Sequence, residues 1–314
     1  MYGQFFILFG LILVGYYCNK KGYLPMETNK NVGNMVMRVT IPAMLITTIA
    51  SIEITDRVLK AFFFSAAGQA AMMILFGFLM RQYGRKRGLG SRLLPMIDLT
   101  TGSLNTGFIG LPVTMIFFGQ AGIIYMSAGV LALNLYLWSY GVYLISDKKA
   151  TGAAAIGKSF LQGAINPNCI SILLGLLLAV THTARFVPTV VGFLTKVGDL
   201  STPLSLIYIG ALAGGSGIVQ LFKEKTALEI SVVKMIGMPA LAILAMLFIP
   251  ADGLAKSVFL LSVCMPSAAV VPMMVGRYGY GDKMSSDIVL WTTVLSMATL
   301  PLSVLLAAKL YGAV

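Results

Sequence analysis

Two stretches of the sequence place helix-breaking residues and small polar side chains inside long apolar runs. The first covers residues 105–112 and follows Gly102 and Ser103; the second covers residues 266–272 and contains Ser267. Glycine and proline weaken a helix, because glycine has greater backbone freedom and proline lacks an N–H donor. A break deep in an apolar segment leaves amides and carbonyls unpaired, which is tolerated only inside protein or beside a polar cavity. We therefore expect a binding site at these two breaks.

The helix ends at these breaks favour a negatively charged solute. A new helical segment is expected to begin at Pro112 and another at Pro272, and helix N-termini attract anions through free amides and the helix dipole. The Asn105 side chain adds hydrogen-bond donors and an acceptor. The predicted substrate-binding residues are Asn105, Thr106, Asn134, Ser267, Pro112 and Pro272. For Asn134 a purely structural hydrogen bond between helices remains an alternative.

A second set of polar residues precedes the first break and is a candidate for ion coupling. Asp98 is the acidic residue that lies well inside an apolar run, and such carboxylates are typical proton carriers or cation ligands. Pairing with Arg92 or Arg38 is the structural alternative. The predicted coupling residues, for Na⁺ or H⁺, are Asp98, Thr100, Thr101 and Ser103.

Enzymatic, metal and cofactor chemistry is not expected. The chain has one histidine and lacks the H-E-x-x-H, G-x-S-x-G and phosphate-loop motifs. Its three cysteines lie in or beside apolar runs without C-x-x-C spacing, so we interpret them as small hydrophobic residues. Without a nucleotide site, uphill transport would depend on ion gradients or the membrane potential.

The composition indicates which elements must position these residues. The chain of 314 residues is 58% hydrophobic and 11% charged, with a mean hydropathy of +0.87, whereas soluble domains carry about 25% charged residues. An all-α polytopic membrane protein of ten transmembrane helices is predicted. The expected spans are residues 4–18, 34–52, 58–80, 95–118, 122–145, 168–183, 197–219, 228–249, 256–276 and 287–310.

Charge asymmetry between the loops predicts the orientation of the chain. The loops after the odd-numbered spans hold 17 of the 23 lysines and arginines, a set that includes Lys234 and the run 85–87. Because positive residues are retained in the cytoplasm, both termini are expected outside it, in a plasma membrane. The net charge of +12 is explained in the same way, so no nucleic-acid partner is expected.

Matched prolines indicate an internal repeat. Pro42 and Pro203 are 161 residues apart, and Pro112 and Pro272 are 160 residues apart. Gly119 and Gly279 share the offset of 160. Since each half holds five spans, the second half (160–314) would enter the membrane opposite to the first (1–150). This predicts two inverted five-helix repeats, an architecture typical of secondary transporters.

The motifs also resemble those of a known family. The run 105–112, the prolines at 266 and 272, and the segment around Pro42 are similar to those of the auxin efflux carrier family, in its short prokaryotic form. The resemblance implies a scaffold of spans 1, 2, 6 and 7 and a mobile transport domain of spans 3–5 and 8–10. It further implies crossing broken helices 4 and 9, elevator-like movement, a homodimer formed through the scaffold, and Asn105 as a contact to the substrate carboxylate.

The sequence therefore predicts a secondary active or facilitative transporter of a small organic anion, such as malate, malonate or an auxin-like acid. The alternative within transport is a sodium- or proton-coupled carrier of another small solute. A non-transporting membrane sensor is a different class, which the lack of an attached soluble domain disfavours. A channel is disfavoured because no ring of charged residues is apparent.

Overall fold

The computed structural model describes residues 2–145, 165–215, 224–247, 251–278, 280 and 282–312. Every regular element in these ranges is helical. The α-helices are α1 (Tyr2–Lys20), α2 (Met26–Met35), α3 (Ile41–Ala50), α4 (Asp56–Lys86), α5 (Leu93–Gly102), α6 (Leu111–Tyr136), α7 (Val142–Ile145), α9 (Pro167–Thr181), α10 (Pro188–Asp199), α11 (Ser201–Gly215), α13 (Lys225–Met246), α14 (Gly253–Val263), α15 (Val271–Arg277) and α16 (Asp282–Tyr311). Wider π-helical turns occur at η1 (Val36–Thr40), η2 (Thr106–Gly110) and η3 (Leu137–Gly141), and η4 (Thr183–Phe186) is a 3₁₀ turn.

Several of these helices suit a bilayer by length and composition. Six helical stretches of the described residues are long and apolar enough to cross a membrane: Met26–Ala50, Asp56–Lys86, Leu93–Ile145, Pro188–Gly215, Lys225–Met246 and Lys283–Tyr311. Each of the ten expected spans falls mainly on helical residues, some of them in shorter or interrupted helices such as Pro167–Thr181 and Gly253–Val263. Ten crossings stay a prediction, whereas a helical multi-pass membrane protein agrees with the structure.

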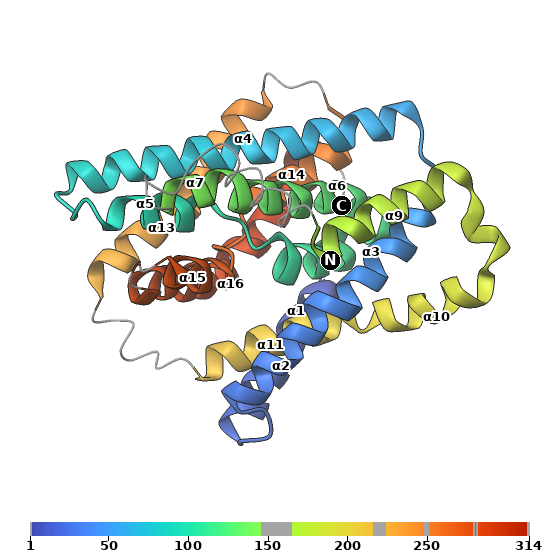
Figure 1. Ribbon diagram of the computed structural model, residues 1–314, viewed down its shortest axis with the longest axis horizontal. Helices are drawn as coiled ribbons and strands as arrows, with labels where there is room; N and C mark the ends of the chain where they lie inside the picture. Colours follow the sequence, from blue (N-terminus) through green and yellow to red (C-terminus); the bar gives the residue numbers. More distant parts are fainter. Residues whose placement is uncertain are drawn as a thin grey trace.

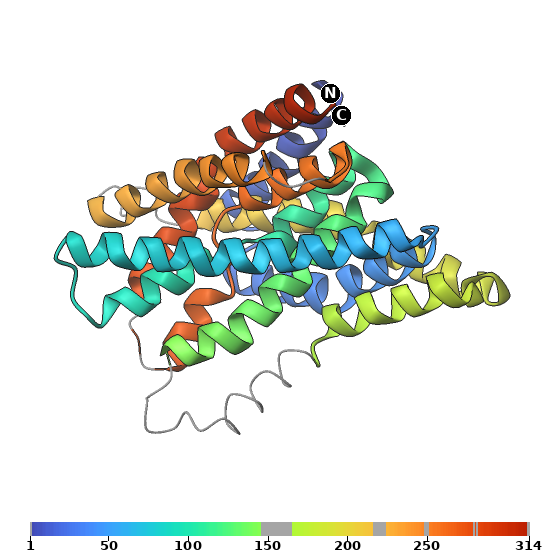
Figure 2. The ribbon, with the colours of Figure 1, turned by 90° about the horizontal axis from the view of Figure 1, so that it is seen from above.

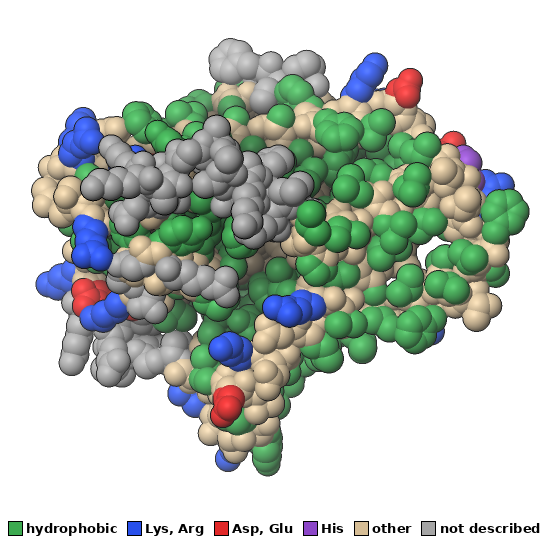
Figure 3. Space-filling view, viewed as in Figure 1, with side chains coloured by type: hydrophobic (Ala, Val, Ile, Leu, Met, Phe, Trp, Pro, Cys, Tyr) green, Lys and Arg blue, Asp and Glu red, His purple; other side chains and the backbone are tan. Residues whose placement is uncertain are grey.

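The outer surface of the molecule is largely apolar. Figure 3 shows apolar side chains over much of one face, with lysines and arginines mainly toward its edges. Phe6 on α1 is 80% exposed and Leu173 on α9 is 61% exposed. Exposure of so much apolar surface to water would be unfavourable, whereas the same side chains are stable in contact with lipid.

The helices pack in two groups. In the first, α1 lies against α11, and α3 lies against α9 and α10 (Figure 1). In the second, α4 packs on α5 and α6, α16 packs on α13 and α14, and α14 also contacts α6. The two chain ends lie near each other in both ribbon views (Figure 2).

Glycines allow the helix backbones of the first group to touch. A Cβ atom added at Gly15 of α1 would lie 2.0 Å from the carbonyl oxygen of Ile207 in α11. A Cβ atom at Gly210 of α11 would lie 1.9 Å from the carbonyl oxygen of Ile12 in α1. A side chain larger than hydrogen therefore cannot fit at either position without separating the helices, as in other close crossings of membrane helices.

Two prolines are accommodated by a π-helical turn placed before them. The turn η1 precedes Pro42, and the turn η2 precedes Pro112. In each turn the amide of the residue before the proline bonds five residues back, from Ile41 to Val36 and from Leu111 to Thr106. The wider turn makes room for the proline ring and for its missing N–H. The chain thus stays helical through both prolines.

Candidate functional site: the crossing of two interrupted helices

Two helices are interrupted in the interior of the described structure, at the stretches that the sequence indicates. The helix α5 ends at Gly102, and helical structure resumes at Thr106 in η2, which continues directly into α6. The helix α14 ends at Val263, and α15 begins at Val271. Each interruption therefore leaves non-helical residues with backbone groups that need partners other than those of a helix.

The two interruptions contact each other directly. The backbone amide of Asn105 donates to the carbonyl oxygen of Pro266 over 2.8 Å. The amide of Ala268 donates to the hydroxyl oxygen of Ser103 over 3.1 Å. Asn105 is 6% exposed and Ser103 is fully buried, so these bonds form in the protein interior. Segments about 160 residues apart in the chain are thus joined at one point.

A lysine that the sequence analysis assigned to a loop lies at this point. Lys234 belongs to α13 and is 1% exposed. Its ammonium group donates to the carbonyl oxygen of Ser103 over 2.6 Å and to the hydroxyl oxygen of Ser267 over 2.8 Å. It therefore bridges the two interruptions. The expectation that Lys234 belongs to a cytoplasmic loop is wrong, because α13 carries it into the bundle; without it, 16 of 22 basic residues support the predicted orientation.

The helix ends at the crossing carry opposite partial charges. The C-terminal ends of α5 and α14 and the N-terminal ends of η2 and α15 all lie at the interruptions. The first N-terminus is at Thr106, and the prediction that it begins at Pro112 is wrong, since η2 carries helical structure through that proline. The second begins at Val271, one residue before Pro272, as expected. The Asn105 side chain caps η2 by accepting the amide of Phe108 over 3.3 Å.

Two buried polar atoms beside the first interruption have no hydrogen-bond partner among the described residues. They are the hydroxyl oxygen of Thr106 and the side-chain oxygen of Gln69 in α4. Both side chains lie against Gly129 of α6, where an added Cβ would be 2.3 Å from the Gln69 oxygen and 3.1 Å from the Thr106 methyl carbon. Buried acceptors are normally paired, so these two are candidates to contact a solute or ion. Gln69 is not among the residues that the sequence motifs indicate, although it is a lone amide in the apolar part of α4.

The other predicted polar residues have partners within their own helices, and the Thr100 hydroxyl also hydrogen-bonds the Ser285 hydroxyl of α16 over 2.9 Å. The Asn134 amide donates to the carbonyl of Val130 one turn earlier, and the hydroxyls of Thr100 and Thr101 donate to the carbonyls of Met96 and Ile97. Ser267 lies in the second interruption, and its backbone amide donates to the hydroxyl of Thr292 in α16 over 3.1 Å. Of the predicted set, Ser103, Asn105 and Ser267 therefore meet at the crossing, and Thr106 adjoins it.

Asp98 is buried in α5 with tyrosine partners. Its carboxylate accepts the hydroxyl of Tyr140 over 3.0 Å, and the hydroxyl of Tyr136 donates to its backbone carbonyl over 3.3 Å. The other carboxylate oxygen has no hydrogen-bond partner among the described residues, and no ion pair joins Asp98 to Arg38 within them. A buried carboxylate held mainly by a phenol suits a group that gains and loses a proton.

The crossing residues are buried in this conformation, and two cavities lie away from them. Phe108 of η2 stacks on Tyr208 of α11, with ring centroids 4.9 Å apart, and so covers the crossing toward the first helix group. A cavity of about 320 Å³ lies between the two groups and is lined by Thr47, Gln120 and Asp199 among others.

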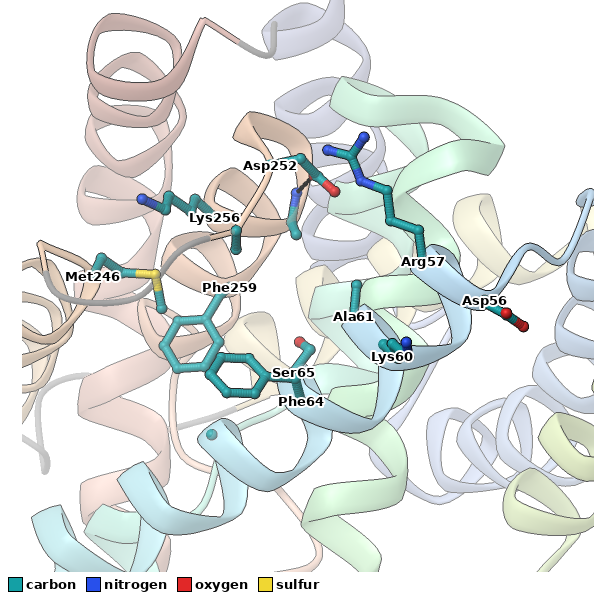
Figure 4. A pocket seen from close by; sticks show the side chains of 13 residues that line it. Asp56, Arg57, Lys60, Ala61, Phe64, Ser65, Met246, Asp252, Lys256 and Phe259 are labelled. Carbon is teal, nitrogen blue, oxygen red and sulfur yellow. Dashed lines mark hydrogen bonds between the residues drawn. The ribbon is translucent and has the colours of Figure 1, made fainter.

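A larger cavity of about 780 Å³ lies between α4 and α14 and does not include the crossing residues. Arg57 and Lys60 of α4 and Lys256 of α14 line its rim, with Phe64 and Phe259 among its apolar side chains (Figure 4). Asp56 and Asp252 also line it, so the charge of the rim is mixed.

A bundle of apolar helices with two interrupted helices in contact is typical of membrane transport proteins. Residues 1–304 match the model of the family described as "Membrane transport protein". The chain belongs to this family, which contains the auxin efflux carriers and is not a family of enzymes.

Two curated relatives match nearly the whole chain. One is an uncharacterized transporter of Methanothermobacter thermautotrophicus, 24% identical over 296 residues that cover 93% of each chain. Another is an uncharacterized transporter of Methanocaldococcus jannaschii, 24% identical over 305 residues that cover 93% of this chain and 94% of the relative. The resemblance drawn from the motifs is therefore confirmed.

Proposed function

We propose that the protein is a secondary carrier, active or facilitative, that moves a small organic anion across the plasma membrane. A carboxylate of the size of malate or malonate, or an auxin-like acid, would bind at the crossing of the interrupted helices. The bond from the Asn105 amide to the Pro266 carbonyl carries this proposal, because it joins the two interruptions into one site.

The electrostatics of the crossing support an anionic substrate. Two helix N-termini, at Thr106 and Val271, provide partial positive charge. The side-chain nitrogen of Lys234 lies beside them and adds a positive charge in its protonated form. A second N-terminus and a buried cation would each repel a cationic solute, so an anion is favoured.

Reciprocal glycine contacts support the two inverted repeats. Gly15 of α1 faces the backbone of Ile207, and Gly175 of α9 faces the backbone of Ile46. Gly175 lies 160 residues after Gly15, and Ile207 lies 161 residues after Ile46. One contact thus becomes the other when the halves are exchanged, as expected for repeats related by a two-fold axis.

The two packing groups support an elevator-type alternating access. The group with α1, α3, α9, α10 and α11 would be the scaffold (spans 1, 2, 6 and 7), and the group with α4–α6, α13, α14 and α16 would be the transport domain (spans 3–5 and 8–10). Sliding of the second group would expose the crossing to either side. We further propose that both chain termini lie outside the cytoplasm and that the scaffold forms a homodimer.

Transport by purified protein in liposomes tests this proposal. Wild-type protein should take up a radiolabelled carboxylate with saturable kinetics, and Asn105→Ala should lower that uptake. Because Asn105 also caps η2, Asn105→Ser serves as the matched control: serine keeps the cap but lacks the amide donors. Uptake that is normal in Asn105→Ala, in a protein that transports carboxylates, would exclude this residue from the site.

A proton-coupled carrier is the second candidate, and the burial of Asp98 favours it. The carboxylate lies inside α5 with the Tyr140 hydroxyl as its side-chain partner. If substrate and proton move together, Asp98→Asn should abolish uptake driven by a pH gradient while leaving exchange of substrate between the two sides of the membrane. Loss of neither activity would remove Asp98 from coupling.

A further inference from the structure

We propose that the ammonium group of Lys234 occupies a monovalent-cation site at the crossing, as a built-in cation in place of a free sodium or potassium ion. This inference deepens the proposed function, because it places the site at the same crossing. On this proposal, the crossing does not need to bind a sodium or potassium ion from solution.

The contacts of Lys234 are those of a cation site. Its ammonium nitrogen lies 2.6 Å from the carbonyl oxygen of Ser103 and 2.8 Å from the hydroxyl oxygen of Ser267. Neutral carbonyl and hydroxyl oxygens at unwound helix breaks are the groups that coordinate alkali cations in carriers with interrupted helices. One of these oxygens comes from each interruption, so the ammonium group bridges them as a bound ion would.

A helix C-terminus lies beside the ammonium group of Lys234. Its side chain is 1% exposed, and the described part of the chain contains no ion pair between Lys234 and a carboxylate. A buried ammonium without any compensation would be very unfavourable. The Ser103 carbonyl directly follows the C-terminal end of α5, so one negative helix end faces the ammonium group, and the Ser267 hydroxyl oxygen is its second partner.

A tethered cation has a functional consequence. In carriers that use sodium, unwound carbonyls and helix C-termini at the crossing coordinate the ion, so the site is complete only with the ion bound. Here the cation belongs to α13 and moves with it, so the bridge between Ser103 and Ser267 persists with or without ions in solution. Binding at the crossing should therefore not depend on sodium.

Removal of the lysine side chain should turn this position into a site for free cations. Lys234→Ala leaves the oxygens of Ser103 and Ser267 around a cavity that ammonium, methylammonium or sodium ions can enter. The full-length protein in detergent should unfold at a lower temperature in choline chloride and recover toward the wild-type Tm in ammonium or sodium chloride of equal ionic strength. Lys234→Met fills the same space without a charge and should show no recovery.

Two further samples, Lys225→Ala and the wild-type protein, serve as controls. Lys225→Ala, at an exposed position of the same helix, is the matched control and should respond to no cation. Wild-type protein should have equal Tm values in sodium and choline chloride. Recovery of Lys234→Met to the same extent as Lys234→Ala, absence of recovery in Lys234→Ala, or sodium-specific stabilisation of the wild type would each overturn the proposal. If Lys234→Ala does not fold in choline chloride, its yield after purification in ammonium chloride gives the same comparison.

This measurement is independent of transport. It contains no organic acid, so a protein that carries none of the acids tested can still show the cation site. Conversely, carboxylate uptake together with a cation-insensitive Lys234→Ala variant would reject the built-in cation and leave the proposed function in place.

Discussion

The close crossing of α1 and α11 can be tested by a single methyl group. In Gly15→Ala the new Cβ atom would lie 2.0 Å from the Ile207 carbonyl oxygen, whereas ordinary van der Waals contact begins at 3.4 Å. The two backbones would have to separate by about 1.4 Å, and overpacking of this kind costs about 1–3 kcal/mol. Gly10→Ala in the same helix is the control, because no atom lies within 4 Å of its Cβ position.

Gly15→Ala should be less stable than Gly10→Ala. Both substitutions gain about 0.8–1 kcal/mol from helix propensity, so this gain cancels and the two variants should differ by the overpacking cost of about 1–3 kcal/mol. Thermal unfolding of each purified protein in the same detergent measures the difference. Gly175→Ala should fall between them, since its nearest atom is the Ile49 Cβ at 2.9 Å. Equal Tm values for Gly15→Ala and Gly10→Ala would refute the close crossing.

Three further predictions concern the crossing and its surroundings. Thr106→Val removes a buried hydroxyl without a partner among the described residues, so it should leave the free energy of unfolding unchanged or raise it by up to about 1 kcal/mol while lowering carboxylate uptake. A fall in stability would instead show that the hydroxyl is paired. Gly129→Ala places a Cβ 2.3 Å from the Gln69 oxygen, so it should lower the free energy of unfolding by about 1–3 kcal/mol and reduce uptake. Normal stability together with normal uptake would contradict the observed packing. Arg87→Gln removes an exposed ion pair with Glu229, at 2.7 Å, and should change the free energy of unfolding by less than about 1 kcal/mol. This effect should disappear at high salt. A larger change in thermal unfolding would show that the pair is shielded from solvent.

The interruptions could be predicted from the sequence, but their boundaries could not. Clusters of glycine, proline and hydroxyl residues indicate both breaks correctly, because such residues weaken helices wherever they occur. The start of the first new helix was predicted at Pro112 and lies at Thr106. The difference arises from the π-helical turn η2, which accommodates the proline ring without ending the helix and which depends on packing around the turn.

Tertiary structure also decides which lysine is buried and which glycine is crowded. Lys234 lies nine residues after Lys225 at the start of α13, and a hydropathy pattern cannot distinguish a lysine that ends a span from one that enters the bundle. Likewise Gly10 and Gly15 both occur in the apolar run of α1, yet only Gly15 of the two faces another backbone. Such distinctions depend on the partner helix, which is far away in the sequence.

Uptake of carboxylates by reconstituted protein tests the central claim most directly. Wild-type protein and Asn105→Ser and Asn105→Ala variants would be placed in liposomes and supplied with radiolabelled malate or malonate. The account predicts saturable uptake by the wild type and a loss of roughly tenfold or more in both variants, the cost of one hydrogen bond to a charged group. Uptake that does not saturate, or that is equal in all three proteins, would contradict a carboxylate site at the crossing of the interrupted helices.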